Sequence, residues 1–197
     1  YSGMQQVAIL ILPLIVYSFY FSKDIMTFLY GQNYAVSSNY FKMFLVFNTT
    51  EIFMFSGIIS AIGKPRINFI FNLLCTILIW IVDYILIKQH LSNALIIAFV
   101  FVLFSVMMQY ILPYFYLTFK QKFLIVNKET LFVILKCSLH SLIVGLIVFV
   151  LSFELLSTSM PLIRLSISIV AFYLLLLLSS KIININYTQA LHKIIKR

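Results

Sequence analysis

Long apolar stretches separated by short polar segments are the main pattern of the chain. Six of them reach or approach the length of about 20 residues that a helix needs to cross a hydrocarbon core of about 30 Å. The pattern predicts spans over residues 5–21, 43–62, 67–87, 94–116, 131–153 and 161–180. The polar–apolar alternation typical of lipid-facing barrel strands recurs nowhere in the sequence. We therefore expect an all-α fold, a polytopic membrane helix bundle with six transmembrane helices.

Glycine and proline residues indicate where these spans turn and bend. Gly63 ends the second span and Pro65 opens the third, which is the usual placement of these residues at helix ends. The second and third spans are therefore expected to form an antiparallel hairpin. Pro13 and Pro113 lie inside the first and fourth spans and are expected to kink them, because proline removes a helical hydrogen bond.

Two segments outside the spans carry amphipathic patterns. In the outer connection 22–42, a short interfacial helix is expected to end at Gly31. Its apolar face consists of Phe21, Ile25, Phe28 and Leu29. The basic tail 181–197 is expected to lie on the inner leaflet, with its apolar face formed by Ile183, Tyr187, Leu191 and Ile194.

Composition and charge place the chain in a membrane. Hydrophobic residues make up 63% and charged residues 10% of the sequence, against about 45–50% and about 25% in soluble domains. So few charges exclude a soluble or disordered chain. Most Lys and Arg residues follow the second, fourth and sixth spans, and cytoplasmic loops collect these residues. We expect a multi-pass plasma-membrane protein with a cytoplasmic C-terminus, in contact with membrane lipid and not with nucleic acid.

Glu51, near the middle of the second span, is the strongest candidate for a functional group. An ionisable group at this depth is costly and usually faces a bundle interior or a wet cavity, so a neutral, protonated carboxyl is expected until a partner or ion arrives. Asn48 lies one turn earlier. The functional interpretation is a proton or cation site in a cavity. The alternative is a neutral Glu that hydrogen-bonds a neighbouring helix.

The third span carries a polar stripe. Asn68, Asn72 and Thr76 recur every four residues, and Asp83 follows seven residues later. At about 3.6 residues per turn these side chains share one face, which is expected to avoid lipid. The sequence leaves open whether that face meets water or another helix, and Asp83 is close enough to the outer end to reach the interface.

The fifth span has weaker candidates. Lys136 and His140 lie one turn apart, and a buried His can relay protons. The interpretation we favour is a snorkelling Lys and a hydrogen-bonded His. Cys137, Ser141 and Gly145 form a ridge of small residues, which indicates close helix packing.

Signatures of catalysis and of metal binding are absent from the sequence. It contains no glycine-rich phosphate loop, no H-E-x-x-H and no G-x-S-x-G. Its three histidines are scattered over a loop, a span and the tail. We therefore expect a protein that is not an enzyme, with no metal site and no cofactor.

Several short motifs resemble those of bacterial polysaccharide flippases of the multidrug/oligosaccharidyl-lipid/polysaccharide exporter superfamily. They are Leu12-Pro13, then Phe28-Leu29-Tyr30-Gly31 followed by Tyr34, then Ala61-Ile62-Gly63-Lys64, with Asn72 in the next span. The resemblance covers residues 1–117. The last two spans are similar only to the extra terminal pair of longer members.

The resemblance implies a two-lobe transporter, of which this chain would be part of the second lobe. Residues 1–117 would supply four helices, 118–180 a cytoplasmic loop and two further helices, and 181–197 the tail. A missing N-terminal part would complete the protein. It would flip an undecaprenyl-pyrophosphate-linked oligosaccharide across the bacterial plasma membrane for O-antigen or capsule synthesis, by alternating access and without ATP hydrolysis. Family cavities are often basic, whereas the charge at mid-span here is the acidic Glu51.

The sequence leaves three alternatives to the flippase function. A small-molecule or drug exporter of the same superfamily would favour a more aromatic cavity. A polymerase or ligase of polysaccharide assembly typically has arginines or histidines in a long outer loop, and the outer loops here contain His90 alone. A structural membrane subunit would leave the polar stripe and Glu51 without a role.

Overall fold

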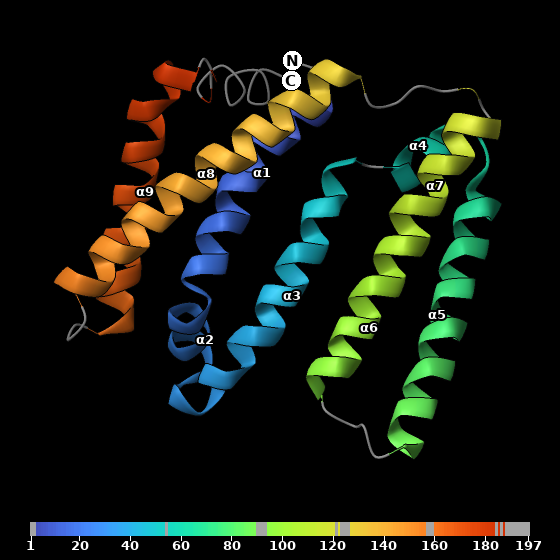
Figure 1. The fold of residues 1–197 in the computed structure, drawn as a ribbon, viewed down its shortest axis with the longest axis horizontal. Coiled ribbons are helices and arrows are strands. Elements are labelled where there is room, and N and C mark those ends of the chain that lie inside the picture. Colours follow the sequence, from blue (N-terminus) through green and yellow to red (C-terminus); the bar gives the residue numbers. More distant parts are fainter. Residues whose placement is uncertain are drawn as a thin grey trace. The chain divides into compact units, whose positions relative to one another are not determined.

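The computed structural model describes residues 3–53, 55–89, 94–120, 122, 127–156, 160–183, 185 and 187. Within these ranges the regular structure is entirely helical (Figure 1). Six helical segments are long and apolar enough to cross a membrane, over residues 3–20, 32–61, 65–88, 94–120, 128–155 and 161–181. The all-α fold with six spans is confirmed, and the chain is a multi-pass membrane protein.

The helices pack into two units, and each is described by itself. Unit 1 consists of residues 1–45 and 128–197, and unit 2 of residues 46–127. This division by packing does not follow the domain boundary at residue 117 that the family resemblance implies.

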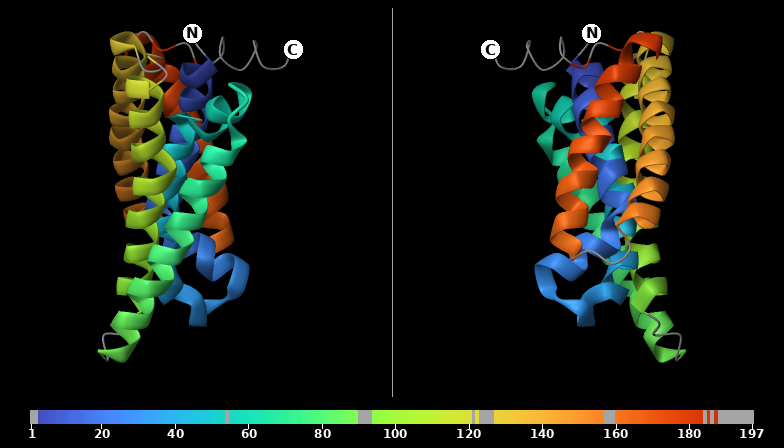
Figure 2. Two further views of the ribbon diagram at one scale, coloured as in Figure 1. Left: turned by 90° about the vertical axis from the view of Figure 1, so that its right-hand side faces the viewer. Right: turned by 90° about the vertical axis from the view of Figure 1, so that its left-hand side faces the viewer.

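Unit 1 is built on the contact between α1 (Gly3–Tyr20) and α8 (Lys128–Leu155). The two helices lie side by side (Figure 2), because the ridge of small residues on α8 lets α1 approach closely. Cys137 and Ser141 are fully buried. A Cβ atom added at Gly145 would lie 2.8 Å from the ring of Tyr20. The predicted packing role of this ridge is confirmed, and α9 (Pro161–Ile183) packs on α8 as well.

The segment after α1 contains the short helix that the sequence predicts. This helix, α2, covers Ser22–Tyr30 and ends at Gly31, whose φ of +91° is the left-handed conformation that glycine adopts without strain. A 3₁₀ segment, η1 (Gln32–Ser37), leads into α3 (Ser38–Thr49). The helix α1 continues through Pro13 without interruption. Placement of α2 in the membrane interface stays a prediction.

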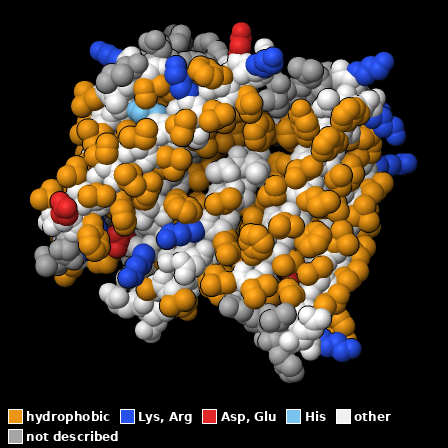
Figure 3. Space-filling view, in the orientation of Figure 1, with side chains coloured by type: hydrophobic (Ala, Val, Ile, Leu, Met, Phe, Trp, Pro, Cys, Tyr) orange, Lys and Arg blue, Asp and Glu red, His pale blue; other side chains and the backbone are white. Residues whose placement is uncertain are grey.

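Unit 2 contains the predicted hairpin. α4 (Phe55–Ala61) packs against α5 (Pro65–Lys88), and Gly63 between them has a φ of +79°. α5 lies beside α6 (Ala94–Val106) in Figures 1 and 2. Large apolar side chains, among them Trp80 at 75% exposure, cover the outer side of α5. Hydrophobic side chains also dominate the face drawn in Figure 3, as a lipid-contacting surface requires.

Two of the spans are irregular where the sequence predicts plain helix. The second span, within residues 32–61, is not one regular α-helix, because a 3₁₀ segment, η2 (Thr50–Phe53), lies between α3 and α4. The hydroxyls of Thr49 and Thr50 each donate to the backbone carbonyl three residues earlier, at 2.6 Å. Such bonds compete with the helical ladder and bend it.

The fourth span departs from an α-helix around Pro113. Two π-helical turns, η3 (Met107–Ile111) and η4 (Tyr116–Lys120), flank the short α7 (Leu112–Phe115) that contains this proline. Proline lacks a backbone N–H and pushes away the carbonyl of the preceding turn. A local shift to the wider π spacing relieves that clash, so the predicted kink takes the form of changed helical pitch.

Candidate functional site

An open cavity of about 450 Å³ lies in unit 2. We call it the unit 2 groove. Its polar lining consists of Glu51, Ser56, Asn68, Asn72, Thr76, Ser105, Gln109 and Tyr110. Four of the five main candidates from the sequence, Glu51, Asn68, Asn72 and Thr76, are therefore brought together on one cavity. The fifth, Asn48, is not part of its lining.

The polar stripe of α5 forms one wall of this groove. Asn68, Asn72, Cys75, Thr76 and Ile79 line it, a stretch of about 16 Å at about 1.5 Å per residue. Asn68 and Thr76 lie three and eleven residues after Pro65, the first residue of the helix. Asn68, Asn72 and Thr76 therefore share a face that lines the cavity.

Glu51 stands at the break between α3 and α4, within η2. The side chains of Glu51 and Thr50 lie close enough to the Tyr110 hydroxyl to interact with it. Tyr110 is only 7% exposed and lies in the π-helical turn η3. The ring of Phe47 packs edge-on against that of Tyr110, with centroids 6.0 Å apart. Two irregular helix segments therefore place an acid and a phenol next to each other.

Some of the polar lining already serves the structure. The Asn68 amide donates to the backbone oxygen of Ser56 at 2.6 Å and to the Ser60 hydroxyl at 3.0 Å, so it ties α5 to α4. The Thr76 hydroxyl donates to the Asn72 carbonyl at 3.0 Å. These bonds hold the wall of the groove in place.

The remaining lining is aromatic and uncharged. Phe55, Phe71 and Phe101 join Tyr110 at the groove. Among the described residues that line it, Glu51 is the only one with a formal charge, and Lys and Arg are absent from the lining. The groove is thus a mixed polar and aromatic cavity with one acidic group.

Asp83 lies further along α5 and outside the groove lining. One of its carboxylate oxygens is buried without a hydrogen-bond partner among the described residues. The structure thus separates Asp83 from the other members of the stripe. The prediction that it reaches the interface stays untested.

His140 belongs to a polar cluster inside unit 1, and Lys136 lies one turn earlier on α8. His140 is 3% exposed, its Nδ1 atom lies 2.9 Å from the Tyr187 hydroxyl, and its Nε2 atom lies 2.7 Å from the Ser179 hydroxyl. The Lys136 ammonium lies over the ring of Phe132, 5.4 Å from its centroid. These contacts are those of the hydrogen-bonded His that we favoured.

Tyr187, near the start of the tail, packs inside unit 1. It is 4% exposed and hydrogen-bonds His140, and the placement of the tail on the inner leaflet stays a prediction. A buried imidazole needs polar partners, and the start of the tail supplies one. Most of the predicted tail, including Leu191 and Ile194, lies outside the described residues.

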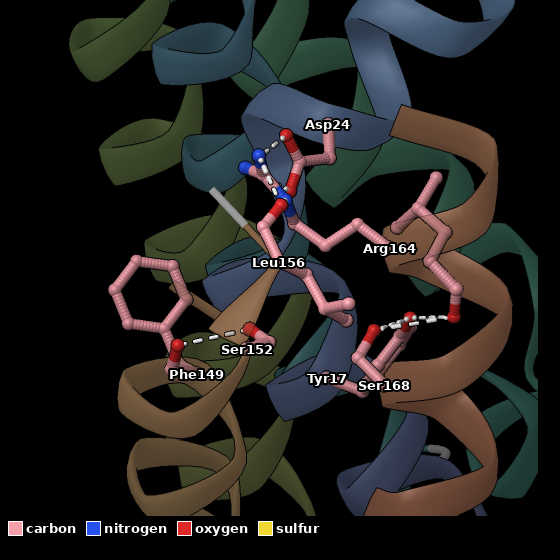
Figure 4. Close-up of polar contacts among 8 residues, drawn as sticks. Tyr17, Asp24, Phe149, Ser152, Leu156, Arg164 and Ser168 are labelled. Atoms are coloured by element: carbon pink, nitrogen blue, oxygen red, sulfur yellow. Dashed lines mark hydrogen bonds and ion pairs between the residues drawn. The ribbon is translucent and has the colours of Figure 1, made fainter. Parts of the chain in front are cut away.

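Sequence reasoning missed the ion pair of unit 1. Arg164 contacts Asp24 at 3.3 Å, and its guanidinium also donates to the backbone carbonyl of Leu156 at 3.0 Å (Figure 4). The Tyr17 hydroxyl lies beside Ser168 at 2.9 Å, one helical turn further along α9. The available signal was that an Arg within a span needs a partner, but α2 and α9 are far apart in sequence.

Groups of three or more His, Cys, Asp or Glu side chains that could hold a metal ion do not occur among the described residues.

No family model matches the chain, and no curated protein or solved structure matches it.

Proposed function

We propose that the chain is part of a membrane transporter and that the unit 2 groove receives its cargo. The observation that carries this proposal is the convergence of Glu51, Asn72 and Thr76 from two membrane-spanning segments on one open cavity. Polar side chains at membrane depth are costly, and they persist where they face a wet cavity.

The backbone of the groove supports the same function. Broken helices occur at the binding sites of transporters, and irregular backbone is tolerated at membrane depth where it lines a cavity or is buried in protein. η2 contributes Glu51 to the groove, and η3 contributes Gln109 and Tyr110. Both irregular segments therefore contribute side chains to the lining of the groove.

The more specific proposal is a bacterial flippase of lipid-linked oligosaccharide, acting by alternating access in the plasma membrane with its C-terminus in the cytoplasm. This proposal rests on the motif resemblance. Two glycines of those motifs, Gly31 and Gly63, are the glycines with positive φ. The motifs thus coincide with turns where glycine is favoured on physical grounds.

A second candidate is an exporter of small organic cations. A carboxylate beside aromatic rings is a suitable site for such a cation, and the groove combines Glu51 with Phe55, Phe71 and Tyr110. Exporters of small molecules belong to the same superfamily that the motifs of this chain resemble.

The test uses the full-length protein reconstituted in liposomes. Movement of an undecaprenyl-pyrophosphate-linked oligosaccharide between leaflets is measured for the unaltered protein and for Glu51→Gln. We expect the variant to insert normally and to lose transport, because the ionisable group of the groove is gone. Glu154→Gln is the matched control, since Glu154 is exposed at the end of α8 in unit 1.

Two results would count against the proposal. Transport at the normal rate by Glu51→Gln would remove Glu51 from the mechanism. Failure of the unaltered protein to move the lipid-linked sugar, together with export of an organic cation such as tetraphenylphosphonium, would favour the second candidate.

A further inference from the structure

The chemistry of the unit 2 groove indicates which part of an amphipathic cargo it can hold. We propose that the groove binds an uncharged, hydroxyl-rich group, the sugar portion of the cargo, and that it excludes the anionic pyrophosphate. This inference rests on the proposed transport function, and the two can fail separately.

The polar groups of the groove suit a polyol. Asn72 and Gln109 present amides, Ser105 and Thr76 present hydroxyls, and Glu51 presents a carboxyl. Amides and hydroxyls both donate and accept hydrogen bonds, as sugar hydroxyls do. They lie on α5, on η2 and along α6 and η3, so a ligand in the groove meets polar groups from several sides.

Aromatic rings supply the second element of sugar recognition. The face of an aromatic ring is negative and attracts the C–H groups of a sugar ring. Phe55, Phe71 and Phe101 line the groove together with Tyr110. A cavity of about 450 Å³ lies within the range of about 300–1,000 Å³ typical of ligand pockets.

An anion would be poorly placed in this groove. An anion needs a cationic partner, and the described lining contains no Lys or Arg, while its one carboxyl, Glu51, is acidic. Lys64 and Arg66 are the basic residues that precede Asn68 on the chain. They lie at the turn into α5, outside the lining of the groove. A pyrophosphate in the groove would therefore meet one carboxyl and no cation.

A cysteine reporter in the groove tests the inference. Thr76→Cys is placed in the purified chain in nanodiscs, with Cys75→Ser so that the buried Cys137 is the only other thiol. An uncharged, water-soluble maleimide is the label. Ile77→Cys is the matched control, because Ile77 is the next residue on α5, is 46% exposed and does not line the groove.

The first expected result concerns hydration. Thiols react as thiolates, so Cys at position 76 in a wet groove should react at least about tenfold faster than Cys at position 77 in lipid. Equal rates would show that the groove is not hydrated and would overturn the inference.

The second expected result concerns the ligand. Uncharged trisaccharides built from glucose, galactose or N-acetylglucosamine are added at millimolar concentration, with inorganic pyrophosphate and tetraphenylphosphonium as comparisons. At least one trisaccharide should slow the labelling of Thr76→Cys, and pyrophosphate should not. Protection by pyrophosphate, or by tetraphenylphosphonium alone, or by none of the probes, would overturn the inference.

Substitutions separate a sugar from a cation as the ligand. Glu51→Gln removes the carboxylate that would hold an organic cation, so any protection by tetraphenylphosphonium should weaken at least about tenfold. Asn72→Leu should weaken sugar protection at least about tenfold, and Leu73→Ala, on the adjacent exposed face, should not. The reverse pattern would overturn the inference.

The assay also separates this inference from the proposed function. Sugar protection without transport in liposomes would overturn the transport function alone. Transport of the lipid-linked sugar without any sugar protection would overturn the assignment of the groove alone.

Discussion

The contact between α1 and α8 gives the sharpest prediction on stability. At Gly145 an added Cβ atom would lie 2.8 Å and 2.9 Å from two ring carbons of Tyr20 and 3.1 Å from a methyl carbon of Val16. Real Cβ atoms essentially never approach other atoms below 3.0 Å. Gly145→Ala must therefore move Tyr20 or separate the two helices.

The surroundings of Tyr20 limit how cheaply it can move. Its ring packs against Phe149 with centroids 5.7 Å apart, and its hydroxyl donates to the Leu142 carbonyl at 3.4 Å. Overpacking of this kind costs about 1–3 kcal/mol. Replacing a helical glycine by alanine recovers about 0.5–1 kcal/mol of backbone entropy. The net expectation is a loss of about 1–2 kcal/mol in the free energy of unfolding.

The assay compares thermal unfolding of the purified protein in one detergent at one scan rate. A loss of about 1–2 kcal/mol corresponds to a Tm lower by about 2–8 °C in a chain of this size. Cys137, fully buried on the same ridge, should also react with a thiol label at a lower temperature, which identifies unit 1 as the part that opens.

Gly57→Ala is the matched control for this prediction. Gly57 lies in α4, and an added Cβ there meets no atom within 4 Å. This variant should unfold at or slightly above the normal Tm, because it gains backbone entropy without a clash. A Gly145→Ala protein as stable as the Gly57→Ala protein would refute the close-packing argument.

Two further predictions concern the ion pair and the topology. Asp24→Asn removes the anion beside the half-buried Arg164. We expect it to lower the Tm by an amount equivalent to about 1–2 kcal/mol. An unchanged Tm would show that the ion pair does not contribute to stability. Cysteines placed at Asn33 and at Gln89 should react with an impermeant thiol label added to intact cells, while one at Lys122 should not; labelling in the opposite sense would overturn the proposed orientation.

The sequence was informative where a single residue type determines a local structure. Gly31 and Gly63 mark turns because few other residues adopt a positive φ there. The stripe of Asn68, Asn72 and Thr76 was visible because helical periodicity alone places those residues on one face. These features depend on neighbours within a few positions, which a sequence displays directly.

Features that depend on distant segments were not visible. The pairing of Asp24 with Arg164, and of His140 with Tyr187, joins residues far apart in the chain. The break at residues 50–53 was missed because apolar residues flank the polar run 48–51 on both sides, so one span was drawn across it. Thr49 and Thr50 carry the chemistry that bends the helix. The π-helical turns have no sequence signal except Pro113 itself.

The backbone and the side chains of unit 2 indicate the groove independently. Lipid-exposed irregular backbone is strongly disfavoured, since freed N–H and C=O groups have no partner in hydrocarbon. η2 and η3 nevertheless interrupt two different spans, and both contribute residues to the same cavity. A packing defect would explain one interruption, but it would not explain why Glu51 at the first break lies beside Tyr110 at the second. The Thr49 and Thr50 hydrogen bonds and Pro113 thus cause two separate departures from regular geometry, and both departures place polar side chains on the same cavity.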